Sequence, residues 1–364
     1  MAMKKKLALC LALVLIVSAF AGCGGSKATT SPSAAASTAP SAAASAAPST
    51  VNFKVSMVTD TGGINDQSFN QSAWEGLQAL QKDTGAQVNY VESKQAADFT
   101  TNMENMADNG ANLVWGIGYA CADALLDTAK KNPDISFAIV DNSYDTVPSN
   151  VTCLMFKAQE SSFLVGYVAG KSTKTDKVGF VGGIESGLLD AFMYGYEAGV
   201  AYAGKELGKN ITVSTQWAES FSDSAKGKAI AQKMFSDGCD IVYHAAGGTG
   251  TGVIEAAKEA NKYAIGVDRD QAYLAPDNVL TSALKLVGTA VEKVSTQALK
   301  GEKIGGQTIT YGLKDGCVGI PTTNKNMDPA VYTATMAIQD KIIAGTITPP
   351  TTKAEYDTFV SGLK

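Results

Sequence analysis

Hydrophobic and polar residues follow two alternating periodicities along residues 51–364. Short, continuous apolar runs, such as Leu113 to Gly118, are typical of buried strands. The stretches between them repeat apolar residues at helical spacing, as Ser68 to Thr84 does. The pattern predicts strands at 51–58, 87–92, 113–118, 136–140, 178–182, 211–217, 241–244, 263–267 and 308–313, and helices at 68–84, 98–109, 122–131, 161–172, 189–207, 222–236, 252–260, 287–300 and 330–344.

Strands that alternate with helices in this way predict βαβ units and parallel sheets. Residues 51–364 are too many for one hydrophobic core and suit two lobes, one for each of two successive runs of about five βα units. We therefore predict an α/β fold with two Rossmann-like, doubly wound parallel-sheet lobes. Because open sheets of this kind bind ligands beyond the carboxyl ends of their strands, two facing lobes would form a binding cleft.

Residues 1–22 have the three-part organisation of an export signal. Lys4 to Lys6 form a basic region, Leu7 to Val17 form an apolar region that is short for a membrane-spanning helix, and small residues precede Cys23. This junction resembles a bacterial lipobox, although that motif usually has leucine where Phe20 stands. The resemblance implies cleavage before Cys23 and acylation of this cysteine, which would anchor the protein stably at the extracytoplasmic face of the cell membrane. The alternatives are an ordinary signal peptide and an uncleaved N-terminal anchor.

The chain continues through residues 26–50 as serine, alanine and proline, with one charge and no large apolar residue. Such a segment has nothing with which to bury a core, so we interpret residues 23–50 as a lipidated cysteine and a disordered tether with a reach of about 25–30 Å. Removal of the signal and its three lysines changes the formal net charge from −5 to −8. An acidic chain has no electrostatic footprint for nucleic acid and no basic patch for anionic lipid.

Four cysteines follow the tether: Cys121, Cys153, Cys239 and Cys317. They are far apart and lie among apolar or small residues, which favours four buried free thiols, whereas export would permit two disulfides. With one histidine in the whole sequence and no ligand-spaced cluster, the sequence predicts no metal site. That residue, His244, ends a predicted strand and belongs to no recognisable catalytic set with a serine or cysteine.

A long motif follows the first predicted strand, Val58-Thr59-Asp60-Thr61-Gly62-Gly63-Ile64-Asn65-Asp66-Gln67-Ser68-Phe69-Asn70-Gln71-Ser72-Ala73-Trp74-Glu75-Gly76. Others follow it in order, among them Ser220-Phe221-Ser222-Asp223, Ala245-Ala246-Gly247-Gly248-Thr249-Gly250, Gly266-Val267-Asp268-Arg269-Asp270-Gln271 and Thr281-Ser282-Ala283-Leu284-Lys285. Together they resemble the basic membrane protein family of type I periplasmic binding proteins, which includes the purine-nucleoside receptor lipoproteins. The resemblance extends from residue 53 to about residue 350.

The resemblance implies that three hinge segments, near residues 156, 282 and 306, join the lobes and rotate on closure. Lobe 1 would comprise residues 51–156 plus 283–306. Lobe 2 would comprise residues 157–282 plus 307–364.

The resemblance also implies which residues meet the base of a nucleoside. Phe69 and Phe221 resemble the two plates of an aromatic clamp, one from each lobe, and Asp60 resembles an acid that meets the ligand. The polar candidates for the edges of the base are Ser68, Asn70 and Asp141.

The resemblance further implies which residues hold the sugar. Asp268 would accept hydrogen bonds from the ribose hydroxyls, and Lys285 would donate to ribose oxygens. Gly247 and Gly248 would allow the backbone to approach the sugar closely. The glycine-rich stretch that they begin matches neither the dinucleotide fingerprint nor a P-loop, so we favour a sugar over a phosphate there.

Taken singly, these residues also have structural explanations. Phe69 has the helical spacing of a core residue, and Phe221 would equally suit a core. Asp60 and Asp268 would suit helix caps or turns, where aspartate bonds its local backbone. Lys285 would equally be a solvated lysine.

The sequence thus predicts the solute-binding lipoprotein of an ABC importer, which captures a nucleoside, expected to be a purine nucleoside, and delivers it to the permease and ATPase subunits. We expect a monomer without cofactor, metal or catalytic chemistry. The alternatives are a binding protein for a sugar or another signal molecule, a surface-tethered nucleoside-processing enzyme such as a hydrolase, and a sensor or adhesin on the same scaffold.

Overall fold

The computed structural model describes residues 51–323 and 325–363. The predicted signal, the lipidation site at Cys23 and the tether lie outside these residues. None of the described helices is long and apolar enough to cross a membrane.

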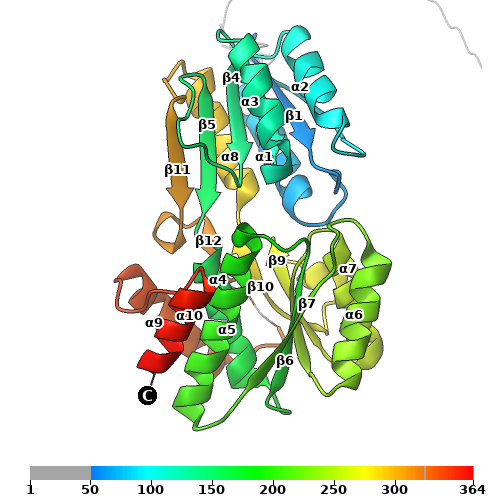
Figure 1. Ribbon diagram of the computed structural model, residues 1–364, viewed down its shortest axis with the longest axis vertical. Coiled ribbons are helices and arrows are strands. Elements are labelled where there is room, and N and C mark those ends of the chain that lie inside the picture. The colour runs from blue at the N-terminus through cyan, green and yellow to red at the C-terminus, as the bar shows by residue number, and fades with distance from the viewer. Residues whose placement is uncertain (1–50, 324, 364) are drawn as a thin grey trace, which may run out of the picture. The chain divides into compact units, whose positions relative to one another are not determined.

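Two six-stranded sheets form the cores of the two lobes (Figure 1). In the first sheet the strand order is β11-β5-β4-β3-β1-β2, and in the second it is β12-β10-β9-β8-β6-β7. The first sheet contains β1 Lys54–Thr59, β2 Gln87–Val91, β3 Leu113–Ile117, β4 Ser136–Val140, β5 Val151–Phe156 and β11 Gln307–Tyr311. The second contains β6 Lys177–Gly182, β7 Thr212–Trp217, β8 Ile241–Ala245, β9 Tyr263–Asp268, β10 Val279–Lys285 and β12 Val318–Gly319.

Every strand pair is parallel except β10 with β12, which is antiparallel. The predicted α/β fold with two doubly wound, parallel-dominated sheets is therefore confirmed. In each sheet the strand order reverses next to the first strand, so the crevice at this reversal is where a ligand is expected to bind.

Helices cover both faces of the sheets. They are α1 Phe69–Thr84, α2 Asp98–Asp108, α3 Ala122–Lys131, α4 Ala158–Ser172, α5 Gly187–Leu207, α6 Ser224–Ser236, α7 Thr249–Ala260, α8 Val287–Leu299, α9 Pro329–Ile343 and α10 Lys353–Gly362, with short 3-10 turns η1 Tyr119–Cys121, η2 Ala272–Leu274 and η3 Leu313–Asp315. Successive side chains of β1 point to opposite faces of the sheet and so belong to two hydrophobic cores. Met57 packs in the cluster that contains α1 and α8, whereas Val58 packs in the cluster beneath α2 and α3.

Glycines bring α1 and α8 together. A Cβ atom on Gly76 would lie 2.2 Å from the carbonyl oxygen of Gly288, so the two helix backbones touch without side chains between them. Ser72 strengthens the same contact, because its Oγ accepts a hydrogen bond from the Gly288 N–H at 3.1 Å.

Three chain segments connect the lobes: Lys157 between β5 and α4, Leu286 between β10 and α8, and Gly312 between β11 and η3. This corrects two of the predicted boundaries. Strand β10 extends the second sheet to Lys285 rather than to residue 282, and β11 pairs with β5, so residues 307–311 belong to the first lobe. A short edge strand of mostly polar residues carries no local signal for the sheet that it joins.

The four cysteines of the described chain, Cys121, Cys153, Cys239 and Cys317, are buried free thiols. Burial raises the pKa of each, so the thiols stay protonated near neutral pH. We conclude that these cysteines act as small apolar core residues.

Candidate functional site

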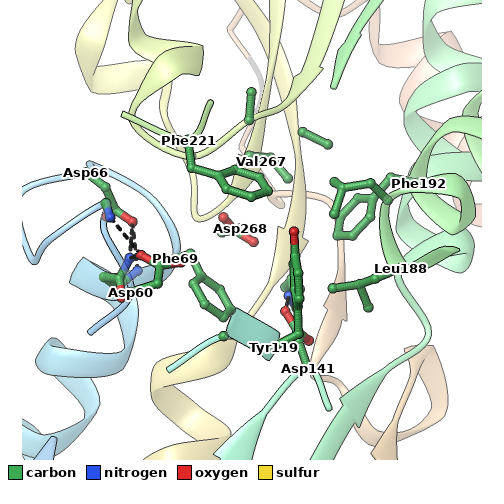
Figure 2. Close-up of a pocket in the computed structure, with 18 residues that line it drawn as sticks. Asp60, Asp66, Phe69, Tyr119, Asp141, Leu188, Phe192, Phe221, Val267 and Asp268 are labelled. Atoms are coloured by element: carbon green, nitrogen blue, oxygen red, sulfur yellow. Dashed lines mark hydrogen bonds and ion pairs between the residues drawn. The ribbon is translucent and has the colours of Figure 1, made fainter. Parts of the chain in front are cut away.

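A pocket lies between the two lobes, at the carboxyl ends of strands from both sheets (Figure 2). Its empty volume is about 550 Å³, including the part that opens to solvent, which is within the usual range for small-molecule sites. Its lining residues are Asp60, Gly62, Asp66, Phe69, Asn70, Gly118, Tyr119, Asp141, Leu188, Leu189, Phe192, Phe221, Ala245, Ala246, Gly247, Val267, Asp268 and Lys285.

Two carboxylates organise the turn between β1 and α1. Asp60 follows the last residue of β1, and its Oδ1 accepts hydrogen bonds from the Gly62 N–H and the Asn70 Nδ2, both at 2.8 Å. Asp66 caps α1 from the preceding turn, because its carboxylate accepts hydrogen bonds from three backbone N–H groups at the start of the helix, those of Ser68, Asn70 and Gln71. The turn is thus pre-organised by its own side chains.

Burial raises the pKa of Asp60 to about 6, although the hydrogen bonds from Gly62 and Asn70 act in the opposite direction. Burial also raises the pKa of Asp66. Both groups therefore hold protons more strongly than aspartate does in water, and a solute that donates hydrogen bonds to them would favour their ionised forms.

Lys285 is the last residue of β10 and lines the pocket. Its Nζ forms a buried ion pair with Asp141 Oδ2, which comes from the turn after β4 in the other lobe. The same Nζ lies 4.5 Å from the centroid of the Phe69 ring, a cation–π distance. Asp141 Oδ1 has no hydrogen-bond partner within the described residues, so one oxygen is left for a solute to occupy.

Asp268 ends β9, and the Ser68 Oγ from the opposite lobe donates a hydrogen bond to its Oδ2. Burial raises the pKa of Asp268 to about 6, while Lys285 and Ser68 lower it. Asp268 and Asp141 both have a left-handed backbone, with φ of 64° and 65°, a conformation that non-glycine residues seldom adopt and that clusters at functional sites.

Two aromatic rings enter the pocket from different lobes. Phe69 is the first residue of α1, whereas Phe221 lies in the loop between β7 and α6, and Figure 2 shows them on opposite sides of the pocket. Gly183 makes room for the second ring, since a Cβ atom there would lie 2.1 Å from Cε1 of Phe221. A flat ligand between the two rings would contact both lobes at once.

Eight of the ten residues predicted to bind the ligand line the pocket: Asp60, Phe69, Asn70, Asp141, Phe221, Gly247, Asp268 and Lys285. The remaining two, Ser68 and Gly248, do not line the pocket, but each is next in sequence to a residue that does. Ser68 reaches the site through its hydrogen bond to Asp268, and Gly248 is the N-cap of α7. Gly247 has a φ of 53°, so glycine is favoured there by the backbone itself.

The sequence prediction missed several pocket residues. Tyr119 follows β3, so the same rule of strand ends that identified Asp60 and Asp141 would have found it. Asp66 is hidden by its appearance as an ordinary helix cap. Leu188, Leu189 and Phe192 belong to α5, where their helical spacing is indistinguishable from that of core residues.

The charges of the pocket are unequal, with four aspartates and one lysine among its lining residues. Such a site opposes the entry of an anion and suits a neutral or cationic solute that carries hydrogen-bond donors. The described residues contain no cluster of side chains able to hold a metal ion.

His244 lies outside the pocket, fully buried in β8, where its Nε2 is 3.0 Å from Gln271 Oε1. Burial lowers the pKa of this histidine to about 4, so the imidazole is neutral at physiological pH.

Comparisons with known proteins agree with the fold. A family profile described as ABC transporter substrate-binding protein PnrA-like matches residues 53–353. Basic membrane protein A of Borreliella burgdorferi is 42% identical over 312 residues, which cover 84% of this chain and 90% of that protein. The CD4+ T-cell-stimulating antigen of Listeria monocytogenes is 41% identical over 320 residues, which cover 82% of this chain and 88% of that protein.

Among solved structures, an ABC transporter solute-binding protein from Aeropyrum pernix K1 has a TM-score of 0.77 at 24% identity, and the match covers 85% of this chain and 97% of that chain. A solute-binding protein from Agrobacterium vitis with bound α-D-tagatopyranose has a TM-score of 0.56 at 15% identity, and the match covers 78% of this chain and 98% of that chain. At these identities the similarity shows the two-lobed fold alone.

Proposed function

Because the chain belongs to the basic membrane protein family of PnrA-like ABC transporter substrate-binding proteins, we propose that it captures a nucleoside, with a purine base, between its lobes. The observation that carries the proposal is the pair of rings, Phe69 from lobe 1 and Phe221 from lobe 2, on opposite sides of one pocket. Stacking of a base on an aromatic ring contributes about 1–3 kcal/mol, so a base between two rings would favour lobe closure directly.

The sugar would lie against Asp268 and Lys285. Asp268 would exchange the hydrogen bond from Ser68 for those of the ribose hydroxyls, and Lys285 would donate to ribose oxygens while it remains paired with Asp141. Asp60 and Asn70 would meet the edge of the base, where Asp60 accepts hydrogen bonds from ring or amino N–H groups. A purine offers such donors, and the ionised carboxylate gains a partner that offsets its burial.

Membership of the family implies a small-molecule ligand and an ABC permease as partners. The finer proposals are that the acylated Cys23 anchors the protein on the outer face of the membrane, that the protein acts as a monomer, and that the solute leaves the cleft unchanged rather than after catalysis. Each of these rests on the sequence motifs and on the family.

Titration calorimetry on the full chain, purified in detergent and refolded to remove carried solute, tests the proposal. Inosine, guanosine and adenosine are expected to bind, whereas free ribose and the 5′-monophosphates bind far more weakly, the first because it lacks the stacked base and the second because the pocket is acidic. Binding of ribose as tight as that of inosine would instead favour a sugar receptor. Failure of folded protein to bind any nucleoside would overturn the proposal.

A further inference from the structure

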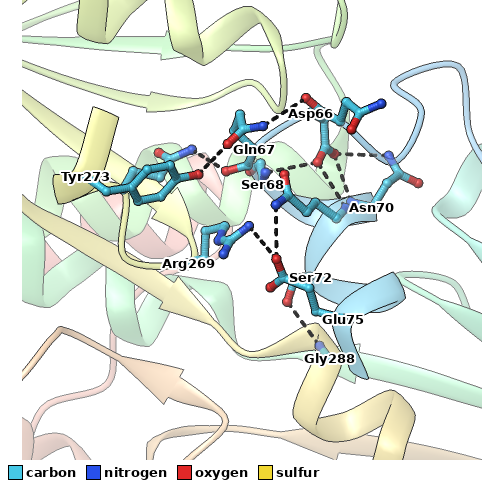
Figure 3. A network of polar contacts seen from close by, with 12 residues as sticks. Asp66, Gln67, Ser68, Asn70, Ser72, Glu75, Arg269, Tyr273 and Gly288 are labelled. Carbon is cyan, nitrogen blue, oxygen red and sulfur yellow. Dashed lines mark hydrogen bonds and ion pairs between the residues drawn. The ribbon is translucent and has the colours of Figure 1, made fainter. Parts of the chain in front are cut away.

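A second set of contacts joins the lobes outside the pocket (Figure 3). Gln67, in the turn before α1, accepts two hydrogen bonds from lobe 2. Its side-chain Oε1 accepts a hydrogen bond from the Tyr273 hydroxyl at 2.6 Å, and its backbone carbonyl accepts one from Gln271 Nε2 at 2.9 Å. None of these three residues lines the pocket, so none of them is placed to contact the solute.

The amide of Gln271 has a fixed orientation. Its Oε1 accepts hydrogen bonds from the Val267 backbone N–H at 3.0 Å and from His244 Nε2, also at 3.0 Å. Since the buried imidazole is neutral, this contact assigns the ring proton to Nε2. With its oxygen engaged twice, the amide must direct its Nε2 across the cleft towards Gln67, which gives the buried histidine of β8 a positioning role.

Tyr273 is held from its own side of the cleft. The Arg269 guanidinium lies 5.5 Å from the centroid of the Tyr273 ring, and it also forms an ion pair with Glu75 of α1 at 3.1 Å. Arg269 is the only arginine in the sequence. Because guanidinium binds a ring face and a carboxylate at the same time, it couples the orientation of Tyr273 to the position of α1.

These contacts are adjacent in sequence to the residues that face the solute. Gln67 precedes Ser68, whose hydroxyl bonds Asp268, and Arg269 follows Asp268 directly. Gln67 also has a left-handed backbone with a φ of 57°, which costs about 1 kcal/mol or more in a non-glycine residue and persists only where neighbouring contacts enforce it. The contacts of Gln67 with lobe 2 therefore add to the hydrogen bonds by which Asp60 and Asp66 already hold this turn.

We propose that Gln67, Gln271 and Tyr273 form an interlobe latch that holds the lobes closed and thereby sets how long the solute stays bound. The inference rests on the proposed function only for the identity of the solute, because the latch itself consists of protein–protein contacts. A latch that forms after the solute has entered slows its release and leaves the rate of entry unchanged.

The test compares Tyr273→Phe with Tyr263→Phe in the full chain. Tyr273 is 49% exposed and loses only the hydroxyl that reaches Gln67, so the fold is expected to tolerate the change. Tyr263, the first residue of β9, is 37% exposed and serves as the control. Stopped-flow release of inosine is expected to be about three- to tenfold faster in Tyr273→Phe, with an unchanged association rate and thermal midpoint. The control should match the wild type.

Gln67→Gly gives an independent variant, because glycine accepts the left-handed backbone while removing the side-chain acceptor. The double variant Gln67→Gly, Tyr273→Phe should release inosine no faster than the faster single variant, since both substitutions remove the same hydrogen bond. Additive effects, or a release rate in Tyr273→Phe equal to that of the wild type, would overturn the latch.

If no nucleoside binds, X-ray scattering of the solute-free protein tests the latch independently of the solute. A larger radius of gyration for Tyr273→Phe than for Tyr263→Phe would support the latch although the solute proposal had failed. Identical scattering from the two variants in that case would overturn the latch as well.

Discussion

Lys285 and Asp141 form a buried ion pair that joins the end of β10 in one lobe to the turn after β4 in the other. The pair crosses the cleft close to the Phe69 ring, and both side chains are almost completely shielded from water. Charges buried in this way are tolerated only while each compensates the other. The ion pair therefore connects the stability of the protein to side chains that line the pocket.

We predict that Lys285→Met lowers the free energy of unfolding by about 3–5 kcal/mol, because it leaves Asp141 buried without its cation and Asp268 with less compensation. Urea unfolding measures the change. The exposed Lys314→Met is the matched control and should stay within about 0.5 kcal/mol of the wild type. The double variant Lys285→Met, Asp141→Leu should recover much of the loss, and a double variant as unstable as Lys285→Met would contradict this account.

The aromatic pair gives a prediction about binding alone. Phe69→Leu keeps an apolar side chain at the start of α1 but removes the ring, so the affinity for inosine should fall by about 1–3 kcal/mol, and Phe221→Leu should act similarly. Calorimetry measures both. The control is Phe235→Leu, a buried phenylalanine of α6 outside the pocket, which should reduce stability without changing affinity. Equal losses of affinity in all three variants would argue against stacking.

The rule that ligands bind at the carboxyl ends of parallel strands explains which site residues could be predicted from the sequence. Asp60, Asp141 and Asp268 each stand at the carboxyl end of a strand, and parallel sheets bring such ends together, so their convergence could be predicted without coordinates. The contacts between opposing lobes could not, because Ser68 and Asp268 are 200 residues apart and nothing local encodes their meeting. Gln67 likewise looks like an ordinary turn residue in sequence.

Errors in the predicted elements have a similar origin. The sequence pattern predicts no strand at Val151–Phe156 or at Val279–Lys285, although both are present, because short apolar or mixed runs do not by themselves distinguish strand from helix. Long amphipathic segments such as α1 and α3 were predicted to within a residue of their observed ends, since their periodicity extends over several turns.

The close contact of α1 with α8 predicts the effect of a single methyl group. Gly76→Ala would place its Cβ 2.2 Å from the Gly288 carbonyl oxygen, so the helices must separate and the variant should lose roughly 1–3 kcal/mol of stability despite the better helix propensity of alanine. Gly187→Ala is the control, because a Cβ at that position meets nothing within 4 Å. Thermal unfolding of both variants measures the difference, and equal midpoints would contradict the predicted contact.

The raised pKa of Asp60 predicts how the stability of the protein depends on pH. Burial raises its pKa from 3.8 to about 6, so between these values the folded protein retains a proton that the unfolded chain has released. The stability contributed by this group is therefore fully present below about pH 4 and is lost as the pH rises through about 6. Above that pH the folded state carries a desolvated carboxylate at a cost of up to about 2–3 kcal/mol.

Asp60→Asn keeps an oxygen that can accept from Gly62 and Asn70 but cannot ionise. The variant should therefore gain stability relative to the wild type on going from about pH 4 to about pH 7.5, by up to about 2–3 kcal/mol in urea unfolding. Asp83→Asn, at an exposed position near the end of α1, is the control and should show no comparable change with pH. A stability difference between Asp60→Asn and wild type that stays constant across this range would show that the Asp60 carboxylate is not desolvated in the folded protein. The carboxylates of the cleft would then be hydrated. In that case a hydrogen-bond donor from the solute would have no burial cost to offset.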